Sequence, residues 1–334
     1  MAASKENPIY SVYVVSGNNK YNLTDCVEDI IFSDQEKQFS KRVQIGMANI
    51  QAGGVWLSSL IKVRDRIYIY ADDGERSEEV WRGFAWSCAY KSSLNTRYIV
   101  LTGYDNLIFF QESEESEYFS SGKSTKDITS SICKKWGVTL EYSYESITHS
   151  KLALRGALSE IITADILDKV KDQKGIKYVV LSEKDVMKVK PVGSNTTIYK
   201  IMAGQNGITT ESECTMEGMV TKVIILGKAD DNDRRPIEAT LTGDTEKYGT
   251  LQKVITKDEN TSLADSKKEG NSLLKENGKP KWEYRVETTD IPWVRKGDKI
   301  EVRAGSMDGY YIVKGIDRTF SNNKKVMSIT AEDV

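Results

Sequence analysis

The stretches VRDRIYI, at residues 63–69, and KGDKIEV, at residues 296–302, decide the fold of this chain. Each predicts a β-strand that is entered through a charged turn, and each is followed by a glycine-bearing hairpin and further strands. The later strands repeat in pairs as well, 80–85 with 311–316 and 97–102 with 325–330, and the last pair ends in Leu-Thr or Ile-Thr. Such internal similarity predicts two copies of one small β module near the two ends of the chain.

A second explanation of this similarity needs no duplication, because any two three-stranded β meanders look alike when only short strand signals are compared. The distinction matters for assembly. A duplicated module lets a ring of n subunits present 2n similar faces, which a single module does not.

The composition is that of a globular chain without a strong charge bias. With 334 residues, the chain has room for two or three domains. An apolar fraction of 39% and a charged fraction of 29% exclude a disordered chain. The formal net charge of −2 gives no electrostatic reason to expect specific nucleic-acid binding or membrane binding.

The cysteine and histidine inventory argues against a metal centre. Cys26, Cys88, Cys133 and Cys214 are far apart in the sequence, and His149 is the single histidine. A zinc site needs four closely held ligands, which this spacing does not provide. Scattered cysteines also favour a reduced compartment over a disulfide scaffold. We therefore expect no metal and no cofactor.

No targeting signal is predicted. The N-terminal residues 1–8 lack the apolar core of a signal peptide, and no run approaches the ~20 apolar residues that span a bilayer. These features predict synthesis in the cytoplasm.

Three segments with different signals follow one another along the chain. Residues 1–104 carry short strands separated by turns, as in a barrel or sandwich. Residues 105–196 predict a small α+β domain. Residues 197–334 return to strands, with one inserted helix near 263–276 that a central glycine weakens. The predicted fold class is mainly β, with two similar β-barrel-like modules flanking an α+β domain.

The middle segment carries the clearest helix signals. Ser124, followed three residues later by Asp127, resembles a capping box, and the helix that it opens is predicted to end at Gly137. A second helix is predicted at 159–171, and a hairpin at 177–189.

None of the motifs predicts a catalytic site. Gly122-Lys123-Ser124 resembles the end of a phosphate-binding loop, but that loop needs a glycine where Glu117 stands, so a helix-entry turn is favoured. The acidic loop at 112–117 is interpreted as solvated surface or a partner contact, because a glycosidase needs two rigidly held carboxylates. His149 is interpreted as a surface or hydrogen-bonded structural histidine, and Cys133 as a core residue. We predict no catalytic, cofactor-binding or metal-binding residue.

Seven stretches of the chain carry a resemblance to a known family. They are 103–111, Phe119, 122–126, 132–137, 152–156, 309–313 and 327–329. Through them the chain resembles the baseplate hub proteins of contractile phage tails, in particular those of defective prophages and R-type bacteriocins of Gram-positive bacteria, within the late control gene D group. The resemblance extends over nearly the whole chain and is most specific in the middle segment.

This resemblance implies a structural protein and not an enzyme. Hub proteins of this kind form a homotrimer whose six similar β modules make a pseudo-sixfold ring. The ring joins the tail tube above to a central spike below and contacts other baseplate proteins. The expected location is the baseplate of a phage tail or tailocin particle, where the hub acts as a symmetry adaptor.

Two other functions remain as alternatives. One is a tail-associated cell-wall hydrolase, which would need a converging acid/base pair or a metal. The other is a cell-wall-binding module that recognises sugars through its aromatic side chains.

Overall fold

The computed structural model describes residues 8–94, 96–142, 144–229, 234–257, 262–321 and 324–334. Residues 1–7, on which most of the signal-peptide prediction depends, lie outside this part. The chain divides into two compact units, residues 1–211 with 284–334, and residues 212–283. Both are rich in strands, so the predicted mainly β fold class is confirmed.

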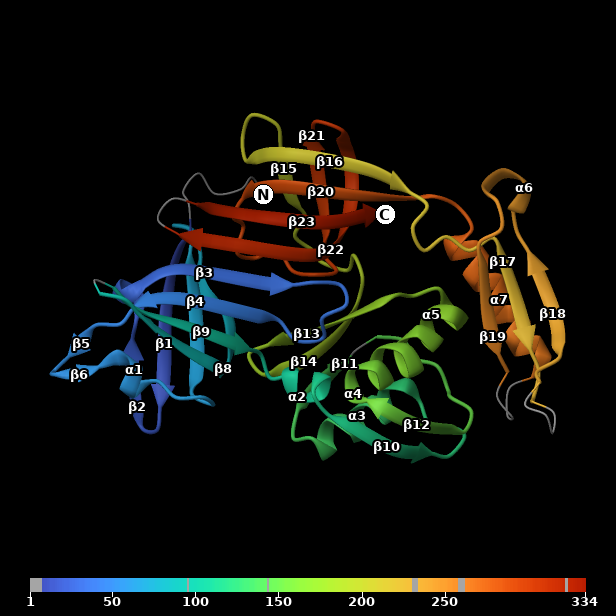
Figure 1. Ribbon diagram of the computed structural model, residues 1–334, viewed down its shortest axis with the longest axis horizontal. Helices are drawn as coiled ribbons and strands as arrows, with labels where there is room; N and C mark the ends of the chain where they lie inside the picture. The colour runs from blue at the N-terminus through green and yellow to red at the C-terminus, as the bar shows by residue number, and fades with distance from the viewer. Residues whose placement is uncertain (1–7, 95, 143, 230–233, 258–261, 322–323) are drawn as a thin grey trace. The chain divides into compact units, whose positions relative to one another are not determined.

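The large unit contains one sheet of thirteen strands, drawn from both ends of the chain (Figure 1). The N-terminal strands are β1 (Ile9–Ser16), β2 (Asn19–Asn22), β3 (Val27–Asp34), β4 (Arg42–Ala48), β7 (Arg66–Asp72), β8 (Ser77–Ser92) and β9 (Arg97–Tyr104). The C-terminal strands are β15 (Tyr199–Met202), β16 (Gly207–Thr215), β20 (Lys281–Thr289), β21 (Lys299–Ala304), β22 (Met307–Ser321) and β23 (Lys325–Asp333). Their order is β16-β20-β23-β22-β3-β4-β9-β8-β7-β1-β2, with β21 beside β22 and β15 beside β21.

The two β modules share one hydrophobic core. Alternate residues of each strand point inward, as the period of two requires, so that Val12 of β1 and Ile69 of β7 are fully buried. Val302 of β21 and Ile329 of β23 belong to the same cluster. The modules meet where β22 pairs antiparallel with β3, from Ile316 opposite Asp34 to Ser321 opposite Asp29.

The entrance to the first long hairpin is built in the same way in both modules. The Lys62 backbone N–H donates to Oδ2 of Asp65 over 2.7 Å, and the Arg295 N–H donates to Oδ2 of Asp298 over 2.8 Å. The residue before each aspartate has a positive φ, 79° at Arg64 and 82° at Gly297. A left-handed conformation at an arginine is uncommon, so its repetition at the matching position indicates a shared turn.

The strands that follow keep the same register. The backbone N–H of Ala85 donates to the carbonyl of Asp65 over 2.8 Å, and that of Val313 donates to Asp298 over 2.9 Å. A β-bulge follows at once in each module, between Ala85 and Ser87 and between Val313 and Gly315. Matching turns and bulges make chance similarity of two meanders an insufficient explanation, and they support the duplication.

The middle segment is an α+β domain with its own core. Its elements are α2 (Ile108–Gln111), β10 (Glu114–Phe119), α3 (Thr125–Lys135), β11 (Thr139–Tyr142), β12 (Leu152–Ala157), α4 (Leu158–Glu160), the π-helical turns of Ile161–Leu167, α5 (Asp168–Lys174), β13 (Tyr178–Glu183) and β14 (Val186–Pro191). The capping box at Ser124 and Asp127 forms as predicted, and Gly137 follows the helix with a φ of 66°. The predicted hairpin is β13 paired with β14.

The prediction that residues 112–117 form an acidic loop was wrong. Its residues from Glu114 onward form β10, which pairs antiparallel with β12. Glu115 and Glu117 turn to the same face, where both bind Nζ of Lys135 at 2.6 Å and 2.5 Å. A single lysine from α3 thus compensates two glutamates that the local composition alone places in solvent.

The remaining elements near the N-terminus are short. A 3₁₀ turn covers Thr24–Cys26, the hairpin strands β5 and β6 cover Gln51–Ala52 and Val55–Trp56, and α1 covers Leu57–Leu60.

The small unit is a separate layer of three strands and a helix. It contains β17 (Lys222–Leu226), β18 (Ile237–Thr242), α6 (Thr245–Tyr248), β19 (Gln252–Thr256) and α7 (Leu263–Asn277). The sequence predicted that residues 197–334 form one β module with one inserted helix. Residues 212–283 instead form a unit with a sheet and a hydrophobic core of their own. Strand signals alone do not state which sheet a strand joins. The rest of the predicted domain division stays a prediction.

The central glycine of α7 has a packing reason. A Cβ at Gly270 would lie 2.6 Å from Cδ1 of Leu241 in β18, so a larger residue here would require the Leu241 side chain to move. This contact explains why a residue that weakens helices lies in the middle of one.

Candidate functional site

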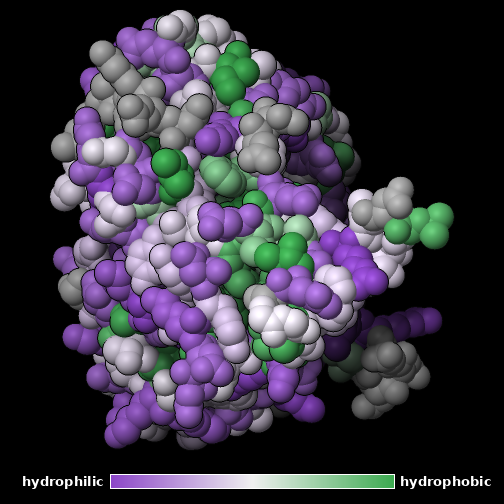
Figure 2. Space-filling view, turned by 90° about the vertical axis from the view of Figure 1, so that its left-hand side faces the viewer, coloured by the Kyte–Doolittle hydropathy of each residue, from purple (hydrophilic) through white to green (hydrophobic). Residues whose placement is uncertain are grey.

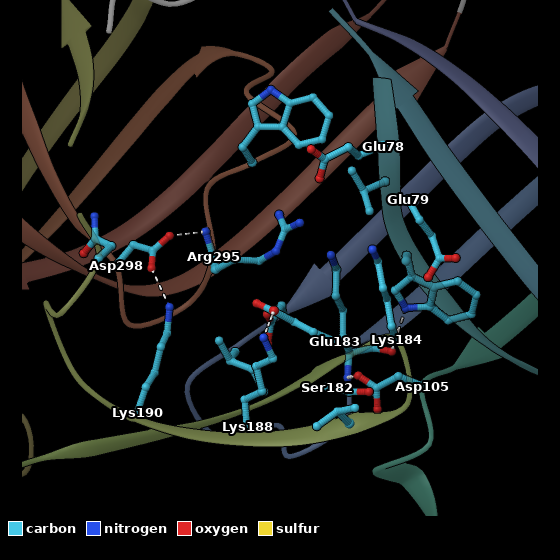
Figure 3. Close-up of a pocket in the computed structure, with 18 of the residues that line it drawn as sticks. Glu78, Glu79, Asp105, Ser182, Glu183, Lys184, Lys188, Lys190, Arg295 and Asp298 are labelled. Atoms are coloured by element: carbon cyan, nitrogen blue, oxygen red, sulfur yellow. Dashed lines mark hydrogen bonds and ion pairs between the residues drawn. The ribbon is translucent and has the colours of Figure 1, made fainter. Parts of the chain in front are cut away.

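A cavity of about 520 Å³ lies in the large unit, where β13 and β14 face the turns of the two β modules (Figure 3). Charged side chains dominate its lining. The labelled residues are Glu78, Glu79, Asp105, Ser182, Glu183, Lys184, Lys188, Lys190, Arg295 and Asp298.

The charges in this cavity compensate one another. Nζ of Lys190 lies 2.9 Å from Oδ1 of Asp298, and Nζ of Lys188 lies 2.9 Å from Oε2 of Glu183 (Figure 3). Asp298 is also the aspartate of the repeated turn, so Lys190 attaches the middle domain to the second β module. The pairing favours a structural role over a binding site for a charged ligand.

Asp105 is the most strongly perturbed acid at this cavity. It is buried, and its carboxylate accepts hydrogen bonds from Oγ of Ser40 at 2.9 Å and from the backbone N–H groups of Lys41 and Leu107 at 3.0 Å. Burial raises the pKa of Asp105 to about 7, against the opposing effect of these donors. A carboxyl group with a raised pKa is a candidate acid or base. Here its hydrogen bonds hold the start of β4 to the end of β9, so we interpret it as a structural group.

The raised pKa of Asp105 predicts a pH-dependent stability. The folded chain keeps this proton up to about pH 7, whereas the unfolded chain loses it near pH 4. The free energy of unfolding therefore falls as the pH rises through this window, by roughly 2 kcal/mol between pH 5 and pH 7. Urea unfolding at both pH values should show this difference in the wild type and a smaller one in Asp105→Asn. An equal pH dependence in the two proteins would contradict it, and Asp308→Asn, at an exposed carboxylate, is the control.

Buried ion pairs join the two β modules. Nζ of Lys296 lies 2.8 Å from Oδ1 of Asp34, and it also donates to the carbonyls of Gln35 and Gln38 at 3.1 Å and 2.6 Å. The start of the second copy is thus attached to the end of β3. Breaking such a pair leaves an uncompensated buried charge, which makes the junction specific.

A second buried network crosses the same junction. Arg318 of β22 pairs with Asp290 over 3.1 Å, and the hydroxyl of Tyr10 in β1 donates to Asp290 over 2.5 Å. Arg318 also donates to the carbonyl of Val294 over 2.6 Å. These polar groups come from both ends of the sequence and hold the modules in one arrangement.

The motifs weighed in the sequence occupy structural positions. Gly122 has a φ of 93° and lies in the turn before α3, whose N-cap is Ser124. His149 is buried, and its Nε2 lies 2.8 Å from Oγ1 of Thr125. Cys133 is buried beside Sδ of Met187 at 3.6 Å, and burial raises the pKa of its thiol to about 12. The structural interpretation of His149 and the core interpretation of Cys133 agree with these contacts.

Among the described residues, no three His, Cys, Asp or Glu side chains are arranged to hold a metal ion. No helix in the described ranges has the length and apolar character to cross a bilayer.

The second half of β8 is largely exposed. Trp86 is 41% exposed and Tyr90 52% exposed. Within the described chain, β7 covers this edge of β8 only from Ser77 to Phe84, and no strand continues beside residues 86–92. Figure 2 views the molecule from the side on which β5 and β6 lie and shows apolar residues in the middle of a largely hydrophilic face.

This free edge was not predicted from the sequence. Aligning the two copies places residues 86–92, six of which are exposed, opposite 314–320, of which only Asp317 is exposed. A pair of equivalent stretches with different surroundings marks a place where one copy lacks a neighbour. Only the registers of both hairpins make that alignment certain.

The comparisons with known proteins identify a family and a fold. The model of a family described as YQBQ-like matches residues 36–332. No protein with a curated description matches the sequence.

Solved structures of tail proteins resemble the chain over nearly its whole length. A tail protein from Neisseria meningitidis MC58 has 12% identity and a TM-score of 0.72, and the match covers 97% of this chain and 96% of that one. A 43 kDa tail protein of prophage MuSo2 from Shewanella oneidensis has 13% identity and a TM-score of 0.71, with 96% and 98% covered. An E. coli component of the type VI secretion system, described as structurally similar to T4 phage tail proteins, has 10% identity, a TM-score of 0.57, and 92% and 74% covered. At these identities the likeness establishes the fold.

Proposed function

We propose, from the premise that the chain belongs to the YQBQ-like family, that it is a structural protein of a contractile tail and serves as the baseplate hub. The resembling structures include two tail proteins and a secretion-system component, which supports a tail role. The duplication of the β module is the observation that supports the assignment as a baseplate hub. The segments 1–104 and 197–334 would act as the two tube-like modules, and 105–196 as the domain between them.

The proposed mechanism is a conversion of symmetry. Three copies of a chain with two similar modules make a ring with six similar faces, which can meet a sixfold tube on one side and a threefold spike on the other. The repeated turn at Asp65 and Asp298 and the repeated bulge give the two modules equivalent backbone surfaces. The partners proposed are two further copies, the tail tube protein, the central spike and other baseplate proteins.

The proposed role is mechanical, with no catalytic step. The buried ion pairs of Lys296 and Arg318 hold the modules in one arrangement, because any other packing that buries one of these charges without its partner is costly. Synthesis in the cytoplasm and assembly into a phage tail or bacteriocin particle complete the proposal. A cell-wall hydrolase has weaker support, because Glu183 and Asp298 of the cavity form ion pairs with lysines and Asp105 is held by hydrogen bonds between β4 and β9.

The expected native mass tests this proposal directly. A homotrimer of a 37.6 kDa chain has a mass of three times that value, about 113 kDa. Light scattering or mass photometry on the purified chain, alone and after co-expression with the spike, should give this species in at least one of the two preparations. A monomer in both preparations would overturn the proposed ring, and a lytic band on a peptidoglycan gel would favour the hydrolase.

A further inference from the structure

The strand β22 has two neighbours along one edge. Its first half, Met307–Ile312, pairs with β21, and its second half, Ile316–Ser321, pairs with β3. The opposite edge pairs with β23. Both edges of β22 are therefore covered within one chain, and Arg318 in its second half is only 2% exposed.

The strand β8 has the same construction with one neighbour missing. Its first half pairs with β7 and its opposite edge with β9. The shared bulge aligns Ala85 with Val313, so residues 88–93 correspond to 316–321. Tyr90, which corresponds to Arg318, is 52% exposed. The position that β3 occupies beside β22 has no occupant beside β8 in the described part of this chain.

The backbone of this free edge is directed outward. The Ser93 N–H donates to the carbonyl of Thr96 over 2.8 Å, which makes Ser93 and Thr96 a hydrogen-bonded pair. Because such pairs alternate along an antiparallel ladder, the N–H groups of Cys88, Tyr90 and Ser92 point away from β9. The second module shows the same alternation, since the N–H of Ser321 donates to Lys324 over 2.7 Å. Unpaired groups of this kind form a template for another strand.

The order of the sheet identifies the strand that fits. It contains the series β3-β4-β9-β8 and, in the second module, β16-β20-β23-β22. The counterpart of β3 is therefore β16, which is the first strand of the sheet. Its residue Gly207 forms an isolated bridge with Ala203, but among the described residues no strand pairs with β16 on the side opposite β20. Within the described residues, β8 and β16 therefore each have an edge with no strand beside it.

We propose that β16 of one copy of this chain, through residues 208–211, pairs antiparallel with residues 88–92 of β8 in the next copy. The contact repeats between chains the pairing that β3 and β22 make within one chain. It is a head-to-tail contact, and such contacts generate a closed ring when the rotation between copies closes. The inference rests on the proposed hub function and adds the residues through which the subunits join.

Tyr90→Pro is the variant that tests this contact. Proline removes the backbone N–H of residue 90 from the free edge. Because this N–H points away from β9, no hydrogen bond between β8 and β9 is lost. We expect the proportion of trimer, measured by mass photometry at a fixed concentration, to fall at least tenfold. Tyr90→Ala keeps the N–H and loses only the side chain, so it should remain far closer to the wild type.

A second proline variant, at Lys20, tests whether a proline on any exposed strand edge disrupts the trimer. Lys20 lies in β2, the last strand at the other end of the sheet order, and the N–H of Leu23 donates to Val12 over 2.9 Å. By the same alternation, the N–H of Lys20 points away from β1. Lys20→Pro should leave the trimer intact. Circular dichroism and urea unfolding of each variant show whether it is folded.

Hydrogen exchange on the wild-type protein tests the contact without a substitution. Peptides containing residues 86–93 and 208–211 should exchange at least tenfold more slowly in the assembled protein than after dilution to monomer, whereas a peptide containing 19–22 should not change. A wild-type trimer with no protection at 86–93, or a folded Tyr90→Pro that assembles fully, would overturn this inference and leave the ring itself standing. A wild-type chain that never assembles would overturn the ring instead.

Discussion

Asp290→Ala is expected to lower the free energy of unfolding by about 3–5 kcal/mol, because it leaves a buried guanidinium without its counter-ion. The side chains of Arg318 and Asp290 are 3% and 1% exposed. The substitution also removes the acceptor of the Tyr10 hydroxyl, so polar groups of both modules lose a partner. Urea unfolding, followed by tryptophan fluorescence, measures the change.

The matched control for Asp290→Ala is Asp308→Ala. Asp308 also binds an arginine, Arg303, at 2.5 Å, but its side chain is 74% exposed. Exposed pairs contribute about 0–1 kcal/mol, so this variant should unfold near the wild type. Equal losses in the two variants would show that the junction does not depend on its buried charges.

Gly83→Ala is expected to destabilise the first module by roughly 3 kcal/mol or more, through a backbone clash. A Cβ at Gly83 would lie 2.1 Å from the carbonyl oxygen of Tyr104 and 2.7 Å from the indole of Trp81. The first of these neighbours is main chain in the adjacent strand β9, which moves only if the ladder opens. Thermal unfolding by circular dichroism measures the loss.

Gly309→Ala is a control in a strand of the second module. It lies in β22, near the start of the equivalent long strand, and nothing lies within 4 Å of an added Cβ. We expect a change within about 0.5 kcal/mol. If Gly83→Ala were tolerated as well as Gly309→Ala, the close approach of β8 and β9 would not be a constraint on the fold.

Features encoded by neighbouring residues were predicted well. The capping box at Ser124 and the glycine after α3 involve hydrogen bonds over a few residues, so their pattern is visible in the sequence. The same holds for the hairpin β13–β14 and for the repeated turns before β7 and β21. In each case the residues that decide the structure are close together in the chain.

Features that depend on distant partners were missed. The glutamates of β10 were predicted to lie in a loop, because the lysine that pairs with them comes from α3 and the strand that pairs with them is β12. The unit at 212–283 was merged with its surroundings, since a strand pattern does not name its neighbour. The buried carboxyl of Asp105 carries no local signal that distinguishes it from a surface aspartate.

The sequence by itself determined that this chain has two related β modules around an α+β domain. Alternation, turns and caps act over a few residues and leave a pattern in the order of amino acids. Only the tertiary structure decided that the modules share one sheet and one core, that Lys296 and Arg318 are buried at their junction, and that one edge of β8 lacks the neighbour its counterpart has. Strand pairing and charge burial depend on residues hundreds of positions apart, and the local pattern is the same whichever partner the fold supplies.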